Sequence, residues 1–145
     1  MNRQPESNAM RFPIRITENL LLEPVLHMFG VRPDTSFVEL DDKNLTVSMG
    51  RWFHETIPLS EISAIAPSDW PWWGGFGVRL AHHGVGVVAS TEGIATLTLK
   101  AAMHVHILAT RIAMEQLWLS LEDPAGFLAA LSAATGLAVG PHKPF

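Results

Sequence analysis

Alternation of apolar and polar residues is the main pattern along this chain, and it predicts strands. Between residues 45 and 49 every second residue is apolar, which places the apolar side chains on one face of an extended segment. Similar short segments predict strands over residues 12–16, 37–40, 45–49, 56–59, 62–66, 77–81, 84–89, 95–100 and 116–121. Turn-forming residues 41–44 separate two of them, so we expect a hairpin there.

Helix signals are concentrated near the end of the chain. Asp123 suits an N-cap, Pro124 suits the first helical position, and residues 127–131 contain an apolar stripe. Gly136 suits the left-handed position that ends a helix. A shorter helix is predicted over residues 23–30.

Many short strands followed by one amphipathic helix predict a mainly β fold. We expect a curved sheet or barrel of about seven or more antiparallel strands, capped by the C-terminal helix. The chain has 145 residues, of which 48% are hydrophobic and 17% charged, which fits one domain with a large core. We place this domain at residues 11–139. Residues 1–10 are expected to be a disordered tail or tag remnant, and residues 140–145 a short tail.

Two stretches resemble the bacterial PH-like (pleckstrin-homology-like) proteins. They are WWGGFGVR at residues 72–79, which leads into a middle strand, and LSLEDPAGFLAAL at residues 119–131, which covers the last strand and the helix. The resemblance extends over about residues 36–134. It implies a PH-like fold that binds lipids, peptides or other proteins. The phosphoinositide mode requires clustered Lys and Arg near a strand loop, and this chain lacks such a cluster.

The aromatic residues in this region form the strongest candidate site. Trp70, Trp72 and Trp73 lie within four residues, and Phe76 follows. One interpretation is that these rings close one end of the barrel as part of the core. The other is that they form an apolar surface or pocket for a protein partner or a small lipophilic ligand. Because near-consecutive rings cannot all point the same way, we expect at least one to be exposed.

Histidines give the alternative function, a metal-binding protein or a small barrel enzyme. His104 and His106 would share one face of a strand, and His82 and His83 lie in a predicted turn that could fold against it. The other interpretation is that these histidines are exposed or hydrogen-bonded. The sequence contains no nucleophile elbow, phosphate-binding loop or zinc-protease motif. We therefore assign no catalytic residue and expect a non-enzymatic protein without a cofactor.

Charge and composition narrow the choice of partners. The net charge is −4 and no two of the ten basic residues are adjacent, which disfavours nucleic acids and anionic membrane surfaces. The absence of cysteine excludes disulfides and thiolate chemistry.

Residues 1–10 lack the apolar core of a signal peptide, and residues 20–31 are too short and too polar to span a bilayer, so we expect a cytoplasmic protein. The apolar tracts at residues 20–31 and 94–114 favour a homodimer.

Overall fold

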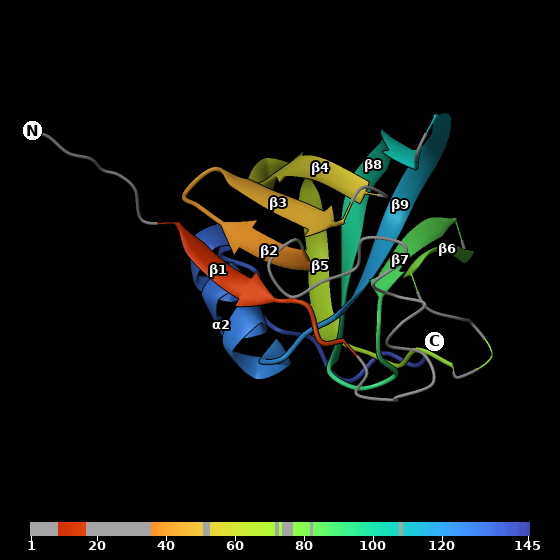
Figure 1. The fold of residues 1–145 in the computed structure, drawn as a ribbon. Coiled ribbons are helices and arrows are strands. Elements are labelled where there is room, and N and C mark those ends of the chain that lie inside the picture. Colours follow the sequence, from red (N-terminus) through yellow and green to blue (C-terminus); the bar gives the residue numbers. More distant parts are fainter. Residues whose placement is uncertain are drawn as a thin grey trace, which may run out of the picture.

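The computed structural model describes residues 9–16, 36–50, 53–71, 73, 77–81, 83–107 and 109–145. These residues form two β-sheets and a C-terminal helix (Figure 1). The first sheet has the order β1-β2-β3-β4 and contains β1 (Met10–Pro13), β2 (Ser36–Leu40), β3 (Asn44–Met49) and β4 (Phe53–Pro58). The second has the order β5-β8-β9-β7-β6 and contains β5 (Ile62–Pro67), β6 (Gly77–Ala81), β7 (Gly84–Val88), β8 (Ile94–Ile107) and β9 (Thr110–Ser120). The mainly β prediction is confirmed.

The hairpin predicted around residues 41–44 is present as β2 and β3. The side chain of Asp41 forms its turn, because one carboxylate oxygen accepts hydrogen bonds from the backbone N–H groups of Lys43 and Asn44 at 2.8 and 2.7 Å. Leu45 pairs with Leu40 across the strands, and the side chains of both are buried. Apolar alternation and the aspartate turn therefore determine the register of this hairpin.

The pairing within the second sheet is not entirely antiparallel. β7 and β9 run parallel, with Gly84 opposite Gln116 and Val87 opposite Leu119, so the expectation of antiparallel strands is wrong here. The connection from β7 to β8 is short, but β8 lies on the far side of β9, between β9 and β5. β9 then returns antiparallel to β8 and so runs in the same direction as β7.

β8 and β9 are longer than predicted, since residues 101–107 and 110–115 also belong to them. The register of the pair shifts between Thr98 and Met103, where β8 contains extra residues opposite β9. Beyond this bulge, Val105 and Met114 are fully buried while most neighbouring side chains are exposed. The bulge bends β8 and lets its far half continue past the end of β5.

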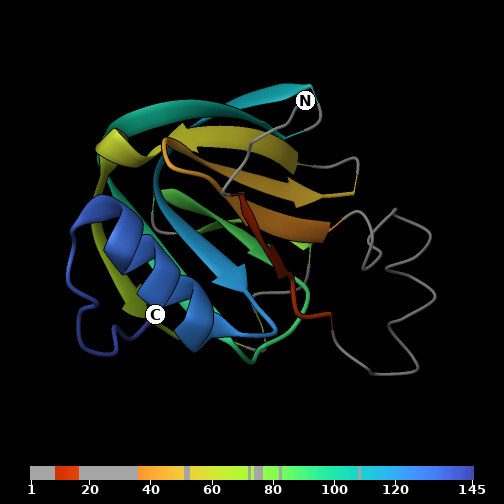
Figure 2. The ribbon, with the colours of Figure 1, turned by 90° about the vertical axis from the view of Figure 1, so that its left-hand side faces the viewer.

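The main core lies between the inner faces of the two sheets and is covered by helix α2 (Pro124–Thr135). Figure 2 shows α2 lying along β5 at the open side between β5 and β1. The ring of Phe127 is fully buried and packs edge-to-face on Phe12 of β1, with 5.3 Å between ring centroids. The helix therefore joins the two sheets, as the prediction of a capping helix required.

The ends of α2 are as the sequence predicted. Asp123 is the N-cap, and its carboxylate accepts a hydrogen bond from the backbone N–H of Gly126 at 3.0 Å. Gly136 adopts the left-handed conformation at the other end, with a φ of 78°. A glycine is favoured there because a side chain would strain this backbone conformation.

Replacement of the N-cap tests how much this local signal contributes. Asp123→Ala is expected to lower the free energy of unfolding by about 1 kcal/mol, because it leaves a helix N–H group without its acceptor. Urea denaturation followed by circular dichroism measures the change. Asp123→Asn retains an acceptor and should stay within about 0.5 kcal/mol of wild type. Equal losses in the two variants would contradict a role for capping.

The two sheets are not closed into a barrel by hydrogen bonds between their strands. On one side, residues 14–16 leave β1 and form isolated bridges, Ile14 to Leu121 and Ile16 to Ala89, so this segment connects the sheets. On the other side, a side chain of β4 joins the sheets, because Glu55 Oε2 accepts a hydrogen bond from the backbone N–H of His106 at 2.8 Å. The curved arrangement of two sheets thus replaces the closed barrel.

Several predictions fall on parts of the chain that the structure does not describe. The helix expected over residues 23–30 lies outside the described residues, as does most of the expected N-terminal tail. The homodimer stays a prediction. In the described part of the chain, no helix has both the length and the apolar character needed to cross a membrane.

Candidate functional site

The second sheet carries apolar side chains on both faces. Val85 and Val87 of β7 point into the main core. On the opposite face, Trp118 of β9 pairs with Gly86, and a second apolar cluster forms with Val88 and Ile94. This explains why every residue of β7 is buried. The outer face of this sheet therefore carries a second, smaller apolar cluster, and other parts of the chain must shield it from solvent.

Trp70 provides part of that cover. Its side chain is only 4% exposed and packs against Trp118, with 6.0 Å between ring centroids. The ring lies directly over Gly86, where an added Cβ atom would stand 2.4 Å from Trp70 Cη2. A glycine is therefore required in β7 at this position, because any side chain would displace the tryptophan.

The end of the chain provides the rest of the cover. Residues 139–145, which we call the strap, run beside β5 and form parallel bridges from Val139 to Ile65 and from Lys143 to Ser68. The hydroxyl of Ser68 also donates a hydrogen bond to the backbone oxygen of Lys143 at 2.7 Å. This path brings Phe145 onto the outer face of the second sheet.

Phe145 completes an aromatic cluster with three tryptophans. Its ring centroid lies 5.4 Å from that of Trp70 and 5.5 Å from that of Trp118. Trp73 stands at the edge of this group, 5.9 Å from Phe145 in an edge-to-face arrangement. We call these four rings the aromatic cluster. Separations of this size are typical of favourable ring pairs.

The cluster divides the predicted tryptophans into two roles. Trp70 is buried, whereas the side chain of Trp73 is 67% exposed, so the expectation that at least one ring faces solvent is confirmed. Trp72 and Phe76 lie outside the described residues. Trp73 is thus a large apolar side chain that is mostly exposed to solvent and contacts Phe145.

Two members of the cluster, Trp118 and Phe145, were not among the predicted site residues. Trp118 had a signal, because it lies on the supposedly polar face of a strand whose other face carries Leu117 and Leu119. A tryptophan there indicates that both faces of the strand are covered. Phe145 had no local signal, since its position depends on pairing with residues far away in the sequence.

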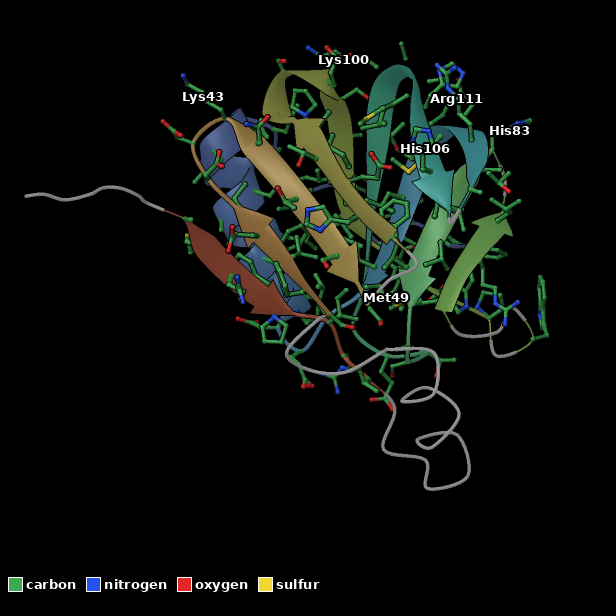
Figure 3. All side chains as sticks on the ribbon, turned by 45° about the horizontal axis from the view of Figure 1, so that its top comes forward. Lys43, Met49, His83, Lys100, His106 and Arg111 are labelled. Carbon is green, nitrogen blue, oxygen red and sulfur yellow. The ribbon has the colours of Figure 1, made fainter. Side chains whose placement is uncertain are left out.

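The three described histidines of the alternative hypothesis, His83, His104 and His106, lie at one end of the molecule. Figure 3 shows His83 and His106 there, and His104 shares the exposed face of β8 with His106. His106 lies opposite Arg111 on β9, and His104 lies opposite Ala113. His82 lies outside the described residues. Within the part of the chain that is described, no three His, Cys, Asp or Glu side chains are grouped so that they could hold a metal ion.

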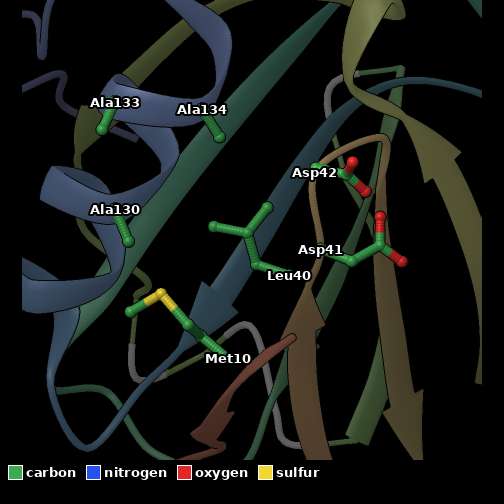
Figure 4. Close-up of a pocket in the computed structure, with 7 residues that line it drawn as sticks. All are labelled: Met10, Leu40, Asp41, Asp42, Ala130, Ala133 and Ala134. Carbon is green, nitrogen blue, oxygen red and sulfur yellow. The ribbon is translucent and has the colours of Figure 1, made fainter. Parts of the chain in front are cut away.

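A shallow depression of about 510 Å³ lies between α2 and the first sheet (Figure 4). Its lining consists mainly of apolar side chains together with two turn carboxylates: Met10, Leu40, Asp41, Asp42, Ala130, Ala133 and Ala134. The carboxylate of Asp41 is engaged by the backbone of the β2–β3 turn. We therefore assign this depression to the packing of the helix against the sheet.

Comparison of the chain with protein-family models, with curated proteins and with solved structures found no match. The functional assignment therefore depends on the geometry of the aromatic cluster. Its four rings carry no group that titrates in the physiological range, but they offer aromatic faces and edges to an apolar or aromatic ligand.

Proposed function

We propose that this chain is a non-enzymatic binding module that contacts a protein partner through the aromatic cluster. The observation that carries the proposal is the 67% exposure of Trp73 on a ring, Phe145, that is itself held by buried tryptophans. A tryptophan side chain has only two torsion angles to fix, so an exposed Trp73 ring loses little conformational freedom when a partner covers it. Tryptophan is enriched among the residues that dominate binding at protein interfaces.

The arrangement of the rings favours a protein over a small lipophilic ligand. The rings contact one another directly, with centroids 5.4–6.0 Å apart, so the cluster presents a surface rather than an enclosed cavity. Small-molecule sites are usually concave and bury most of the ligand. A partner with its own extended surface can cover Trp73 from outside.

The PH-like assignment is part of this proposal. Two features support it: short strands in two curved sheets, and a C-terminal helix that packs between them. The parallel pair β7–β9 departs from the antiparallel arrangement expected from the resemblance. The proposal of binding through the aromatic cluster does not depend on the fold name, because function resides in the site.

Substitution of the exposed tryptophan tests the proposal. Trp73→Ala should weaken binding of the apolar dye 8-anilinonaphthalene-1-sulfonate about tenfold, the effect of losing an interaction of roughly 1.4 kcal/mol. The free energy of unfolding should change by less than about 0.5 kcal/mol, because the side chain is mostly exposed. Dye fluorescence titration and urea denaturation of the same samples measure both quantities.

Leu80→Ala is the matched control. Leu80 lies on the edge strand β6 and is 61% exposed, so its removal also takes an apolar side chain from the surface. This variant should bind the dye as wild type does. If both variants weaken dye binding equally, general surface hydrophobicity rather than the aromatic cluster binds the dye. If oleate displaces the dye completely at equimolar concentration, a lipophilic ligand replaces the protein as the preferred partner.

A further inference from the structure

The strap lies on β5 as an added strand would. Val139 and Lys143 form parallel bridges with β5 and the residue that follows it. The backbone N–H of Gly140 donates to the carbonyl oxygen of Ile65, and that of Lys143 donates to Pro67, both at 2.9 Å. Addition of an extended segment to a sheet edge is a common way for proteins to bind peptides.

The backbone holds the strap weakly. Five residues of the strap, 139–143, span only four residues of its partner segment, 65–68, so the pairing is irregular. Pro141 and Pro144 have no N–H to donate. The hydrogen bond between His142 Nε2 and Asp69 Oδ1, at 2.9 Å, joins side chains that are both more than half exposed, which makes it weak.

Phe145 is therefore the main anchor of the strap. It contacts three tryptophans, whereas residues 141–144 are exposed. Among the described contacts of the strap with β5 and Ser68 are two backbone hydrogen bonds and one from the Ser68 hydroxyl. An exposed segment held at a sheet edge in this way opens at a lower free energy than the sheet beneath it. When it opens, it uncovers both the edge of β5 and the space over Trp70 and Trp118.

We propose that the edge of β5 and the aromatic cluster form a peptide-binding groove, which the strap occupies in cis and from which a partner displaces it. The partner is an extended peptide segment with the chemistry of the strap. It places an aromatic side chain two residues after a backbone N–H that reaches the oxygen of Pro67, as Phe145 follows Lys143. This inference rests on the proposed function and adds to it the chemistry of the partner and its control by the strap.

An external segment gains a contact that the strap does not make fully. Trp73 remains 67% exposed with Phe145 in place, so a partner that has further apolar side chains beside its aromatic residue covers more of this ring. A partner needs this additional contact to displace the strap, because a short tether gives the strap an effective concentration on the order of millimolar. The strap therefore excludes weak peptides and admits those that also cover Trp73.

Binding of the strap sequence in trans tests the groove. The probe is an amidated, fluorescein-labelled VGPHKPF peptide, and the proteins are the full chain and its Phe145→Ala variant. Fluorescence anisotropy should show at least about tenfold tighter binding to the variant, because its strap has lost its anchor. A VGPHKPA peptide should bind the variant at least about tenfold more weakly than VGPHKPF, since it lacks the ring.

A second variant loosens the strap without changing the aromatic cluster. Gly140→Pro removes the N–H that bonds to Ile65 and should also strengthen binding of VGPHKPF relative to wild type. Equal affinities for wild type and both variants, or no binding up to about 1 mM, would overturn the groove. These results are separate from the dye titration: loss of dye binding in Trp73→Ala together with absent peptide binding rejects the groove alone.

Discussion

Phe127→Ala is expected to lower the free energy of unfolding by about 3–5 kcal/mol, the usual cost of removing a fully buried aromatic side chain. Phe127 is the point at which α2 meets the first sheet, through its edge-to-face contact with Phe12. Its loss leaves a cavity between the helix and both sheets, which the rigid strands cannot fill. Urea denaturation followed by circular dichroism measures the change.

Phe37→Ala is the control for this prediction. Phe37 lies on β2 and is half-buried, and its ring faces the guanidinium of Arg11, 3.9 Å from the ring centroid. Such a contact at the surface contributes about 0.5–1 kcal/mol, so the loss should be near 1 kcal/mol. If Phe127→Ala costs no more than Phe37→Ala, α2 is not part of the central core and the packing of the fold is wrong.

Gly86→Ala is expected to lower the free energy of unfolding by about 1–3 kcal/mol, although it adds only a methyl group. That group would stand 2.4 Å from a ring atom of Trp70, so the ring must move away from β7. The displaced ring also loses its contacts with Trp118 and Phe145. Near-ultraviolet circular dichroism should therefore lose much of its tryptophan signal together with the stability.

Gly140→Ala is the matched glycine control. An added Cβ atom there would lie 3.4 Å from the backbone oxygen of Ile65 and 3.7 Å from the side chain of Ala66, which is close to ordinary contact. The expected change in stability is within about 0.5 kcal/mol. Equal effects of the two substitutions would show that close packing of Trp70 on β7 does not stabilise the protein.

The parts of the fold that were predicted correctly depend on neighbouring residues. The hairpin around Asp41 and the helix between Asp123 and Gly136 each contain their own turn or cap residues. The parallel pairing of β7 with β9 has no such local signal, because it is decided by where β8 lies in the sheet. The bulge after Thr98 was not predicted either, because it too depends on the arrangement of distant strands. It lies where β8 extends beyond its pairing with β5.

The candidate site shows the same division. The close spacing of Trp70, Trp72 and Trp73 indicated that at least one ring would be exposed, since neighbouring side chains point in different directions. The sequence could not place Phe145, because residues 65–68 bring the strap to the tryptophans. Trp118 lies between these cases. Its alternation with Leu117 and Leu119 could be read from the sequence, but its burial could be inferred only once the outer face of the sheet was known to be covered.

The order in which the chain is synthesised leaves one edge of β7 unpaired for some time. Residues 84–88 leave the ribosome before residues 116–119, with which they pair, and at that stage β6 is their only strand neighbour. Val85 and Val87, both fully buried in the finished protein, lack the neighbouring strand β9 during this interval. The nascent chain thus presents an unpaired apolar edge, and slow translation of residues 89–115 prolongs the period in which it can aggregate with another chain.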